Sequence, residues 1–451
     1  MSVFGGEFRQ GQAETSSKRG TSIRGVDPYH ARNNDPIYVR LTSMSRAVLS
    51  PIKRSARFST RVVAADHICN EDVAAWAALE SHAIEPNAFL SPYFVIPAAR
   101  HLTPNQPPLV FFVERMAAGE VGCELVGVGV FTESAATKHT PVRRLVGYRS
   151  RHSFLSGLLL DREHAVQALE AMLAFIRKSL PHCKAIELPL ALSDGLLAGP
   201  GGTAVQASMH APRIAKVEPR AILVVADCAG NLRDKTLAAR IRDIDRRQRR
   251  LRERGEVAWR WHREARIPAK AVEAFLSLEH MGWKGDKGSS LRSRPEDEAF
   301  FREAVNWFAS EGRTLFIEVT FDGVPIASLC NFISGNVGFG FKIGWDPAFR
   351  AASPALINEL ELMRHAPTDF GDIDYFDSGA SATSFINELW PARRRVATIS
   401  IPTGWVGAYA LAFTDWSARL KGFARSPSKL IATVRVPGPT KVNMPTFKVE
   451  A

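Results

Sequence analysis

The sequence predicts a mixed α/β protein of two tandem units, each with a mostly antiparallel central sheet flanked by helices. First, 451 residues are too many for one hydrophobic core, so two or three domains are expected. Second, segments with helical periodicity alternate with segments of strand character. Third, one order of elements occurs twice along the chain: a helix, antiparallel strands, a helix and a further strand.

The first unit is expected over residues 61–230. Its elements are a helix at 72–83, strands at 108–115 and 123–131, an amphipathic helix at 161–180 and a strand at 184–191. Asp161 is a suitable N-cap for the second helix, and Pro181 follows its end.

The second unit is expected over residues 256–422. Its elements are helices at 269–283 and 296–312, a meander at 313–344, a helix at 353–366 and a strand at 372–377. Asp322-Gly323 and Gly335-Asn336 are the predicted hairpin turns of the meander.

Composition excludes several classes of protein. With 45% hydrophobic and 23% charged residues the chain is typical of soluble globular proteins. No apolar run approaches the roughly 20 residues that cross a bilayer, and the N-terminal residues lack the apolar core of a secretory signal. We therefore expect a cytoplasmic protein. Five scattered cysteines and dispersed histidines predict neither a disulfide framework nor a metal site.

The net charge of +12 comes from two segments. Residues 1–60 and 233–254 each contain ten Lys or Arg against four Asp or Glu, and the rest of the chain contains 38 of each kind. Residues 1–60 show no sustained periodicity and are predicted to be a disordered basic tail, with contact to an anionic membrane or RNA as the less favoured alternative. Residues 423–451 are a second predicted tail.

The other basic segment lies in a predicted connecting helix, residues 231–255. Four apolar residues at helical spacing form one stripe, and arginines cover the other faces; the stripe consists of Leu237, Ile241, Ile244 and Leu251. The Arg233–Arg254 segment is either a solvated connecting helix or a surface for an anionic partner. The first alternative is favoured, because no aromatic residues are interleaved with the arginines, as nucleic-acid binding would favour.

The turn before the predicted helix at 353–366 has features of an anion site. Ser353 is a preferred N-cap residue and Pro354 suits the first helical position. The free N–H groups and dipole of such a helix end attract anions, and small residues let a phosphate approach the backbone. Residues 350–355, Arg-Ala-Ala-Ser-Pro-Ala, loosely resemble the R/Q-x-x-G-x-G/A pyrophosphate loop of GNAT acyltransferases, with Ser353 at the first glycine. The alternative is a capped core helix.

Several further segments occur in an order that resembles one family. They are 86–102 (PNAFLSPYFVIPAARHL), 246–257 (RRQRRLRERGEV), 279–291 (EHMGWKGDKGSSL), 322–329 (DGVPIASL), 341–357 (FKIGWDPAF…SPALI) and 374–394 (DYFDSGASATSFINELWPARR). Together they resemble the BioF2-like, CelD-type (cellulose biosynthesis) acetyltransferases, a double-GNAT group similar to the FemAB aminoacyltransferases. The resemblance covers about residues 65–420. One departure is Ala355 where the family usually has glycine, which removes freedom for positive φ.

The resemblance implies acyl transfer from acetyl-CoA by direct attack of the acceptor, without a nucleophilic side chain. The donor is then expected to contact the strand and turn residues Lys342, Ile343, Gly344, Arg350, Ala351, Ala352, Ser353, Pro354 and Ala355. Asp377 is the candidate for proton removal, with a turn-capping role as the alternative. Tyr375 is the candidate for protonating the leaving thiolate. Trp283 and Lys284 are expected to shape the acceptor pocket, unless Trp283 only anchors its loop.

Only the C-terminal unit is expected to bind the donor. Asp161 and Glu163 would repel a pyrophosphate at the corresponding helix of the first unit, which is therefore expected to build the acceptor cleft. The leading prediction is an acyl-CoA-dependent N- or O-acyltransferase acting on a polysaccharide precursor or another small polar acceptor. One alternative uses aminoacyl-tRNA as donor, with the 233–254 helix on the RNA. The other is a non-catalytic scaffold that has kept the fold.

Overall fold

The computed structural model describes residues 57–116, 122–137, 140–199, 202–207 and 210–414, all within the compact unit Ile37–Ala451. Most of the predicted N-terminal tail and all of the predicted C-terminal tail lie outside these residues. Residues 57–60, placed in the tail by the sequence, are part of the first strand.

The predicted mixed α/β fold with mostly antiparallel pairing is confirmed. In the first half the strands are β1 (Arg57–Ala64), β2 (Leu109–Met116), β3 (Glu124–Ser134), β4 (Arg143–Gly147), β5 (Leu159–Leu160), β6 (Cys183–Leu192) and β7 (Arg213–Val224). In the second half they are β8 (Val257–His262), β9 (Thr314–Phe321), β10 (Val324–Ser334), β11 (Val337–Trp345), β12 (Tyr375–Asp377) and β13 (Ala392–Pro402).

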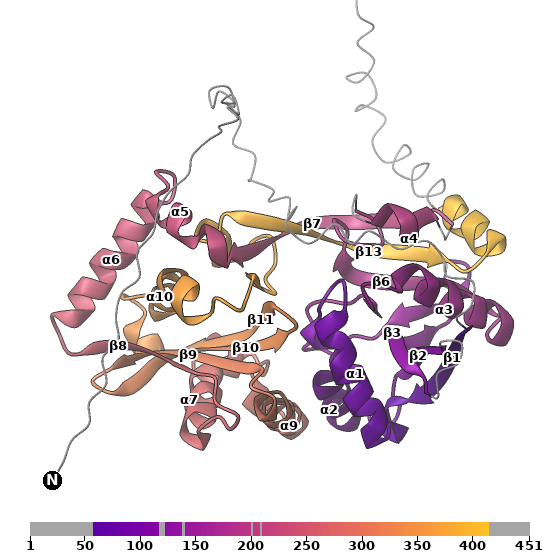
Figure 1. Ribbon diagram of the computed structural model, residues 1–451. Coiled ribbons are helices and arrows are strands. Elements are labelled where there is room, and N and C mark those ends of the chain that lie inside the picture. The colour runs from indigo at the N-terminus through magenta and orange to yellow at the C-terminus, as the bar shows by residue number, and fades with distance from the viewer. Residues whose placement is uncertain (1–56, 117–121, 138–139, 200–201, 208–209, 415–451) are drawn as a thin grey trace, which may run out of the picture. The chain divides into compact units, whose positions relative to one another are not determined.

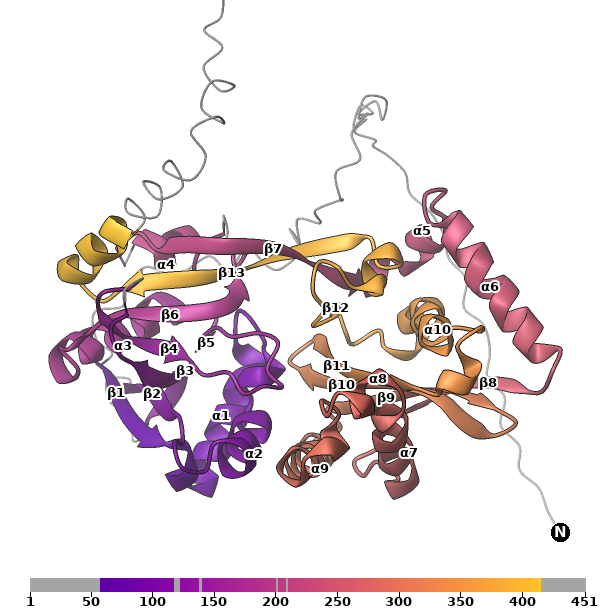
Figure 2. The same cartoon turned by 180° about the vertical axis from the view of Figure 1, so that it is seen from behind.

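These strands form one sheet instead of the two separate sheets that the sequence predicts. Its order is β1-β2-β3-β4-β6-β13-β7-β12-β11-β10-β9-β8, with β5 paired to β3. Read from both edges inward, each strand has a counterpart in the other half. The two halves also exchange strands, because β13 pairs with β6 while β7 pairs with β12. The exchange covers two edges that would otherwise present unpaired backbone groups, and both views show β7 and β13 side by side (Figures 1 and 2).

Helices cover both faces of this sheet. They are α1 (Asn70–His82), α2 (Pro92–Leu102), α3 (Ala165–Ser179), α4 (Thr203–Ala207), α5 (Cys228–Arg233), α6 (Ala238–Arg252), α7 (Ala269–His280), α8 (Trp283–Asp286), α9 (Pro295–Ser310) and α10 (Pro354–Asp369). Short 3-10 turns are η1 (Ala65–His67), η2 (Ala88–Leu90), η4 (Val225–Asp227), η5 (Leu291–Ser293), η6 (Pro347–Phe349) and η7 (Phe385–Glu388). In the second half α10 lies on one face of β9–β11 and α7 on the other (Figure 1). None of the described helices has the length and apolar character needed to span a membrane.

Both predicted hairpin turns are present. Asp322 and Gly323 join β9 to β10 with φ of 48° and 80°, a left-handed conformation that suits the right-handed twist of the strands. Gly335, with φ of 55°, begins the turn from β10 to β11. The predicted apolar stripe of the connecting helix is also confirmed, since Ile244 and Leu251 are buried where α6 packs on α10.

The two halves share a core rich in aromatic residues. Helices α2 and α9 pack against each other, and the rings of Phe94 and Phe300 lie 5.1 Å apart, edge to face. Phe89 of the first half packs in the same way against Phe339 of β11, at 5.9 Å. Burial of such large side chains is the main favourable contribution to holding the halves together.

Strands β11 and β12 separate in the middle of the second half. They pair in parallel only from Val337↔Tyr375 to Phe339↔Asp377, after which β11 continues to Trp345. The register between β10 and β11 shifts at this point, leaving Phe341 without an opposite residue. Such a bulge bends a strand and redirects its side chains, and bulges are common next to active sites. The open edge of β11 leads directly to the turn before α10.

Candidate active site

The turn before α10 is built around Ser353. This residue is the N-cap of α10 with φ of 55° and ψ of 60°, a left-handed conformation in which glycine is normally favoured. The predicted helix start is therefore confirmed, and the backbone explains why a glycine would suit this position. Ala355 lies within the first helical turn, so the freedom of positive φ that alanine lacks is not needed there.

Two backbone donors flank this serine. Within the described residues, the N–H groups of Ala351 and Ala355 make no hydrogen bond, whereas that of Ala352 donates to the carbonyl of Phe349 at 2.9 Å. Pro354 has no N–H to offer. Free amides at the positive end of a helix of this length form an anion-binding arrangement.

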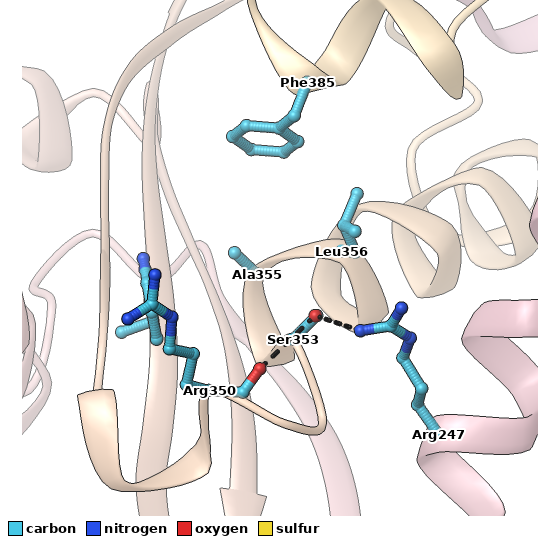
Figure 3. A pocket seen from close by; sticks show the side chains of 7 residues that line it. Arg247, Arg350, Ser353, Ala355, Leu356 and Phe385 are labelled. Atoms are coloured by element: carbon cyan, nitrogen blue, oxygen red, sulfur yellow. Dashed lines mark hydrogen bonds between the residues drawn. The ribbon is translucent and has the colours of Figure 1, made fainter.

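A pocket of about 370 Å³ opens at this turn. It is lined by Arg247, Trp345, Arg350, Ser353, Ala355, Leu356 and Phe385. The two arginines flank the serine from opposite sides, and Phe385 of η7 faces it across the space (Figure 3). The lining contains two guanidinium groups and no carboxylate, so its electrostatic potential favours an anion.

Arg247 is a pocket residue that the sequence reasoning missed. It comes from α6, and its Nη1 donates to the Ser353 hydroxyl at 2.9 Å while its Nη2 lies 2.9 Å from an Asp243 carboxylate oxygen. Arginines fill most polar positions of α6, so nothing in the sequence singled out this one. The only signal was its helical phase, since it lies three residues after Ile244 of the buried stripe and so beside the face that packs on α10.

Of the predicted donor-contacting residues on β11, Lys342 turns its side chain toward α7, whereas Ile343 packs on the other face, against the cluster that contains α10. Lys342 Nζ donates to Glu279 Oε1 at 3.3 Å, and Lys284 Nζ lies 3.5 Å from the same oxygen. Lys284 also donates to the Ile343 carbonyl at 2.7 Å. Gly344 has a packing role, because a Cβ there would lie 2.4 Å from the backbone nitrogen of Glu279.

The Glu279 cluster is deeply buried. The Glu279 side chain is inaccessible and accepts a further hydrogen bond, from the Leu291 N–H at 2.8 Å. Burial lowers the pKa of Lys284. Lys342 and Lys284 are thus held by one carboxylate beside β11, and their predicted contacts with donor and acceptor stay predictions. The side chain of Trp283 lies outside the described part of the structure.

Asp377 lies where β12 leaves β11. Its side chain is buried, and Oδ1 accepts from the Gly379 N–H at 2.8 Å, which is the turn-capping contact considered as an alternative. Arg220 Nη1 of β7 lies 3.6 Å from the same oxygen. Asp377 thus lies beside the open edge of β11, and its role in proton removal stays a prediction.

Tyr375 lies deeper, in the closed part of the strand pair. Its hydroxyl accepts from Arg394 Nη1 at 2.8 Å, and burial raises its pKa. Because it pairs with Val337, about 13 Å along β11 from Phe341 at the usual rise per residue, it lies away from the opening. Its predicted role toward a thiolate stays untested.

A loop of the first half forms a wall at this opening. Phe154 lies against Gly379, where a Cβ would meet its ring at 3.3 Å, and its ring is 6.1 Å from that of Phe341. His152 stacks on Phe300 and its Nε2 is 2.9 Å from Asp297 Oδ1. Burial lowers the pKa of His152 to about 4, so the imidazole is neutral at physiological pH.

One group of side chains elsewhere has the spacing of a metal site. The donor atoms of Glu133, His182 and Cys183 lie within 4.8 Å of one another. His182 Nε2 lies 3.3 Å from Glu133 Oε2, so these two side chains pair with each other. The Glu133 and His182 side chains are exposed and Cys183 is buried.

Comparison with known proteins indicates the class of enzyme. Residues 238–385, about one third of the chain, match the family model described as "Acetyltransferase (GNAT) domain". No curated protein matches the chain. The matched segment includes α6, β11, the turn and α10, so every residue that lines the pocket belongs to it. Residues 238–385 are therefore similar to a GNAT acetyltransferase domain, and the chain is a transferase enzyme of the acyltransferase type.

Several solved structures are similar to this chain. The structure of FemX has 10% identity and a TM-score of 0.49, covering 78% of this chain and 100% of its own. A tandem GNAT protein from the clavulanic acid biosynthesis pathway has 14% identity and a TM-score of 0.36, covering 78% and 99%. The C-terminal domain of a putative lysylphosphatidylglycerol synthetase from Agrobacterium fabrum has 11% identity and a TM-score of 0.40, covering 65% and 85%.

Proposed function

We propose that this chain is an acyl-CoA-dependent acyltransferase that takes its acyl group from acetyl-CoA. The observation that supports this most strongly is the pocket at the start of α10, where free amides and two arginines surround Ser353. GNAT domains typically use acetyl-CoA, and the pyrophosphate of this donor matches a cationic pocket at a helix N-terminus.

In this proposal each part of the second half has one task. Arg247 and Arg350 pair with the phosphates, while the amides of Ala351 and Ala355 donate to phosphate oxygens. The open edge of β11 offers backbone groups that hold the donor chain and polarise the thioester carbonyl. The reactive carbon then lies near the bulge at Phe341, beside Asp377 and the loop of the first half.

The transfer itself needs positioning more than side-chain chemistry. The acceptor nitrogen or oxygen attacks the thioester carbon, the C–S bond breaks, and the acceptor loses a proton to Asp377 directly or through water. The sulfur leaves as a thiolate and takes up a proton from water to give the free thiol. We propose a small polar acceptor, such as a polysaccharide precursor, as the CelD-type resemblance suggests, and a cytoplasmic location for the reaction.

Calorimetric titration with acetyl-CoA tests the donor. We expect micromolar binding to the wild-type protein and loss of binding in the double variant Arg350→Ala, Ser353→Asp. The variant Arg115→Ala, which removes a distant arginine of β2, serves as a control and should bind normally. If the wild-type protein binds neither acetyl-CoA nor longer acyl-CoAs, the donor assignment is wrong.

One observation favours a second candidate, an aminoacyl-tRNA donor. Beside the donor pocket, α6 presents a groove of about 570 Å³ lined by Ala239, Arg242, Asp243, Asp245, Arg246 and Arg249. Arginines on one exposed helix face suit a phosphate backbone, and binding would weaken steeply with salt. Neutralising Arg246, Arg247, Arg249 and Arg250 together should abolish salt-sensitive tRNA binding if this candidate is right. No tRNA binding at low salt excludes it.

A further inference from the structure

Arg220 is a buried cation whose hydrogen-bonding capacity is unused. It lies on β7 with 3% of its surface exposed, and within the described residues neither its Nε nor its Nη1 has a hydrogen-bond partner. A buried guanidinium normally makes several hydrogen bonds, because burying a charge without them is costly. The orphaned pair of N–H groups therefore requires an explanation.

A second arginine on the neighbouring strand shows what a satisfied site looks like. Arg394 of β13 lies directly opposite Arg220 in the antiparallel ladder. Its Nη1 donates to the Tyr375 hydroxyl, and its Nε and Nη2 donate to Asp194 Oδ1 at 3.3 and 3.1 Å. The buried carboxyl group of Glu85 also lies close to it. Like charges directly opposite one another are destabilising, and only one of this pair is compensated by hydrogen bonds.

The single counter-charge of Arg220 does not satisfy it. Asp377 Oδ1 is 3.6 Å from Arg220 Nη1, which is beyond hydrogen-bond distance, and this oxygen already accepts from Gly379. Arg220 and Asp377 thus form a cation and an anion side by side at the end of β12, each with capacity left. That is the arrangement that recognises a ligand bearing both charges.

A second arginine lies near Arg220. Arg149, in the loop after β4, is exposed, and its Nη2 donates to the Ser153 carbonyl at 3.4 Å. Partial burial and the nearby Arg220 cation lower the pKa of Arg149, which places the two guanidinium groups close together. Because Arg149 is exposed, it is a second cation that an anion coming from solvent would meet before Arg220.

We propose that Arg220 binds an oxyanion, a carboxylate or a phosphate, on the acceptor, and that the acceptor carries this group close to its reacting amine. The inference rests on the proposed acyltransferase function. The planar fork of donors on a guanidinium suits the oxygens of one oxyanion. The amine then lies beside Asp377, attacks the thioester carbon, and gives its proton to that carboxylate as the C–S bond breaks.

Anion-dependent thermal stabilisation tests the site without knowledge of the acceptor. Inorganic phosphate and sodium acetate are the two probes, each compared with sodium chloride at equal ionic strength. The measurements use the Arg350→Ala background, so that the donor pocket contributes little. A ligand that binds only the folded protein raises its Tm by mass action. We expect phosphate or acetate to raise the Tm, and Arg220→Met to weaken the apparent affinity of that anion at least tenfold.

Three further variants make the result specific. Arg115→Met removes one distant arginine and should leave the anion effect unchanged. Arg220→Lys keeps the charge without the fork and should retain a weakened effect. If Arg220→Met fails to fold because Asp377 is left without a nearby cation, Arg220→Met combined with Asp377→Asn restores neutrality and should again lack the anion effect.

The outcomes separate this inference from the donor assignment. The stronger of the two probes shows whether the oxyanion is a carboxylate or a phosphate. An anion effect that Arg220→Met leaves unchanged, or no effect of either probe in the Arg350→Ala protein, overturns the inference. Acetyl-CoA binding is measured on Arg220→Met in the otherwise wild-type protein and should be normal. Loss of the anion effect in a protein that binds no acyl-CoA leaves the oxyanion site standing and removes only the proposed donor.

Discussion

Helices α3 and α10 occupy corresponding places in the two halves, yet they begin in different ways. At α3 a carboxylate stands at the entrance, where Asp161 Oδ1 accepts from the N–H groups of Glu163 and His164 at 2.8 and 3.1 Å. At α10 the entrance holds Ser353, free amides and two arginines. Asp161 closes the turn before α3 but is not its N-cap as the sequence predicted, because the helix begins at Ala165 and its N-cap His164 makes no side-chain cap. The start of α10 instead lies open beside a cationic pocket.

The connections before these helices differ as well. The chain passes from Trp345 to Pro354 in a short turn, whereas seventeen residues separate Gly147 from Ala165. The longer connection carries His152 and Phe154 to the opening of the second half. The second half thus has the pocket, and the corresponding connection of the first half lies against the opening between β11 and β12.

The buried faces of the two helices differ in composition, and this difference is expected to have the largest effect on stability. Every buried residue of α3 is apolar, whereas α10 buries Glu359, whose Oε2 has no hydrogen-bond partner in the described residues. Burial raises the pKa of Glu359 to about 8. The unfolded chain loses this proton from about pH 4.5 and the folded protein only near pH 8, so stability falls as the pH rises across that window.

Glu359→Gln should remove this loss of stability at high pH. We expect the variant to be more stable than wild type by about 4 kcal/mol at pH 8, a gain that disappears below about pH 4.5. Denaturant unfolding followed by tryptophan fluorescence at both pH values measures it. Glu361→Gln is the matched control and should lower stability, because Glu361 accepts from Arg364 and Gln248 at 3.0 and 2.9 Å. A gain for Glu359→Gln that is independent of pH would contradict the assignment.

Ser353→Asp should make the start of α10 resemble that of α3. The new carboxylate pairs with Arg247 and repels the donor phosphates, so we expect acetyl-CoA affinity to fall about 100-fold, or about 2.7 kcal/mol. Ser353→Asn has nearly the same shape, tolerates the left-handed backbone and adds no charge. Calorimetry should find it close to wild type, and equal losses in both variants would show that shape, not charge, matters here.

Arg247→Ala should weaken acetyl-CoA binding about tenfold, or about 1.4 kcal/mol, because one of two cations leaves the pocket. Arg246 is a close control, since it also pairs with Asp243 but does not line the pocket. Titration of Arg246→Ala should give near-normal affinity. Equal effects of the two substitutions would mean that α6 acts through its overall charge.

Asp161→Ala should cost about 1 kcal/mol of stability through loss of its two hydrogen bonds to backbone N–H groups. It should leave acetyl-CoA affinity unchanged and create no second binding site in the first half. The stoichiometry of the same titration checks this. Two donor molecules bound per chain would mean that Asp161 alone blocks the first half.

Local signals predicted much of the fold. Asp322-Gly323, Pro354 at a helix start and the stripe of α6 each depend on neighbours a few residues away, so the sequence shows them directly. The joining of the sheets could not be predicted in this way. Strand β13 includes Arg393, Arg394 and Arg395, which resemble a surface segment, and its partners β6 and β7 lie about 170 to 220 residues earlier. Such pairing depends on closure of a long loop, which local periodicity does not report.

The candidate site was predictable to the same degree. Residues 350–355 stood out because a turn of small residues before a capped helix has a physical meaning. Arg247 and Arg220 did not, because an arginine in a sequence is normally solvated, and only the structure shows which ones face a pocket or lose their water. Lys342 lies on β11 as the sequence predicted, but the carboxylate of Glu279 that it shares with Lys284 comes from another element and has no sequence signal.

The strand exchange has a consequence for synthesis on the ribosome. The first half is translated early, yet the strand that covers β6 is residues 392–402, near the end of the described chain. Until that strand emerges, β6 presents a bare edge on which another nascent chain can pair. The order of translation therefore delays completion of the half that is made first. A chain that stalls between α6 and β13 is an aggregation-prone intermediate. A split of the gene between the halves would leave two incomplete sheets.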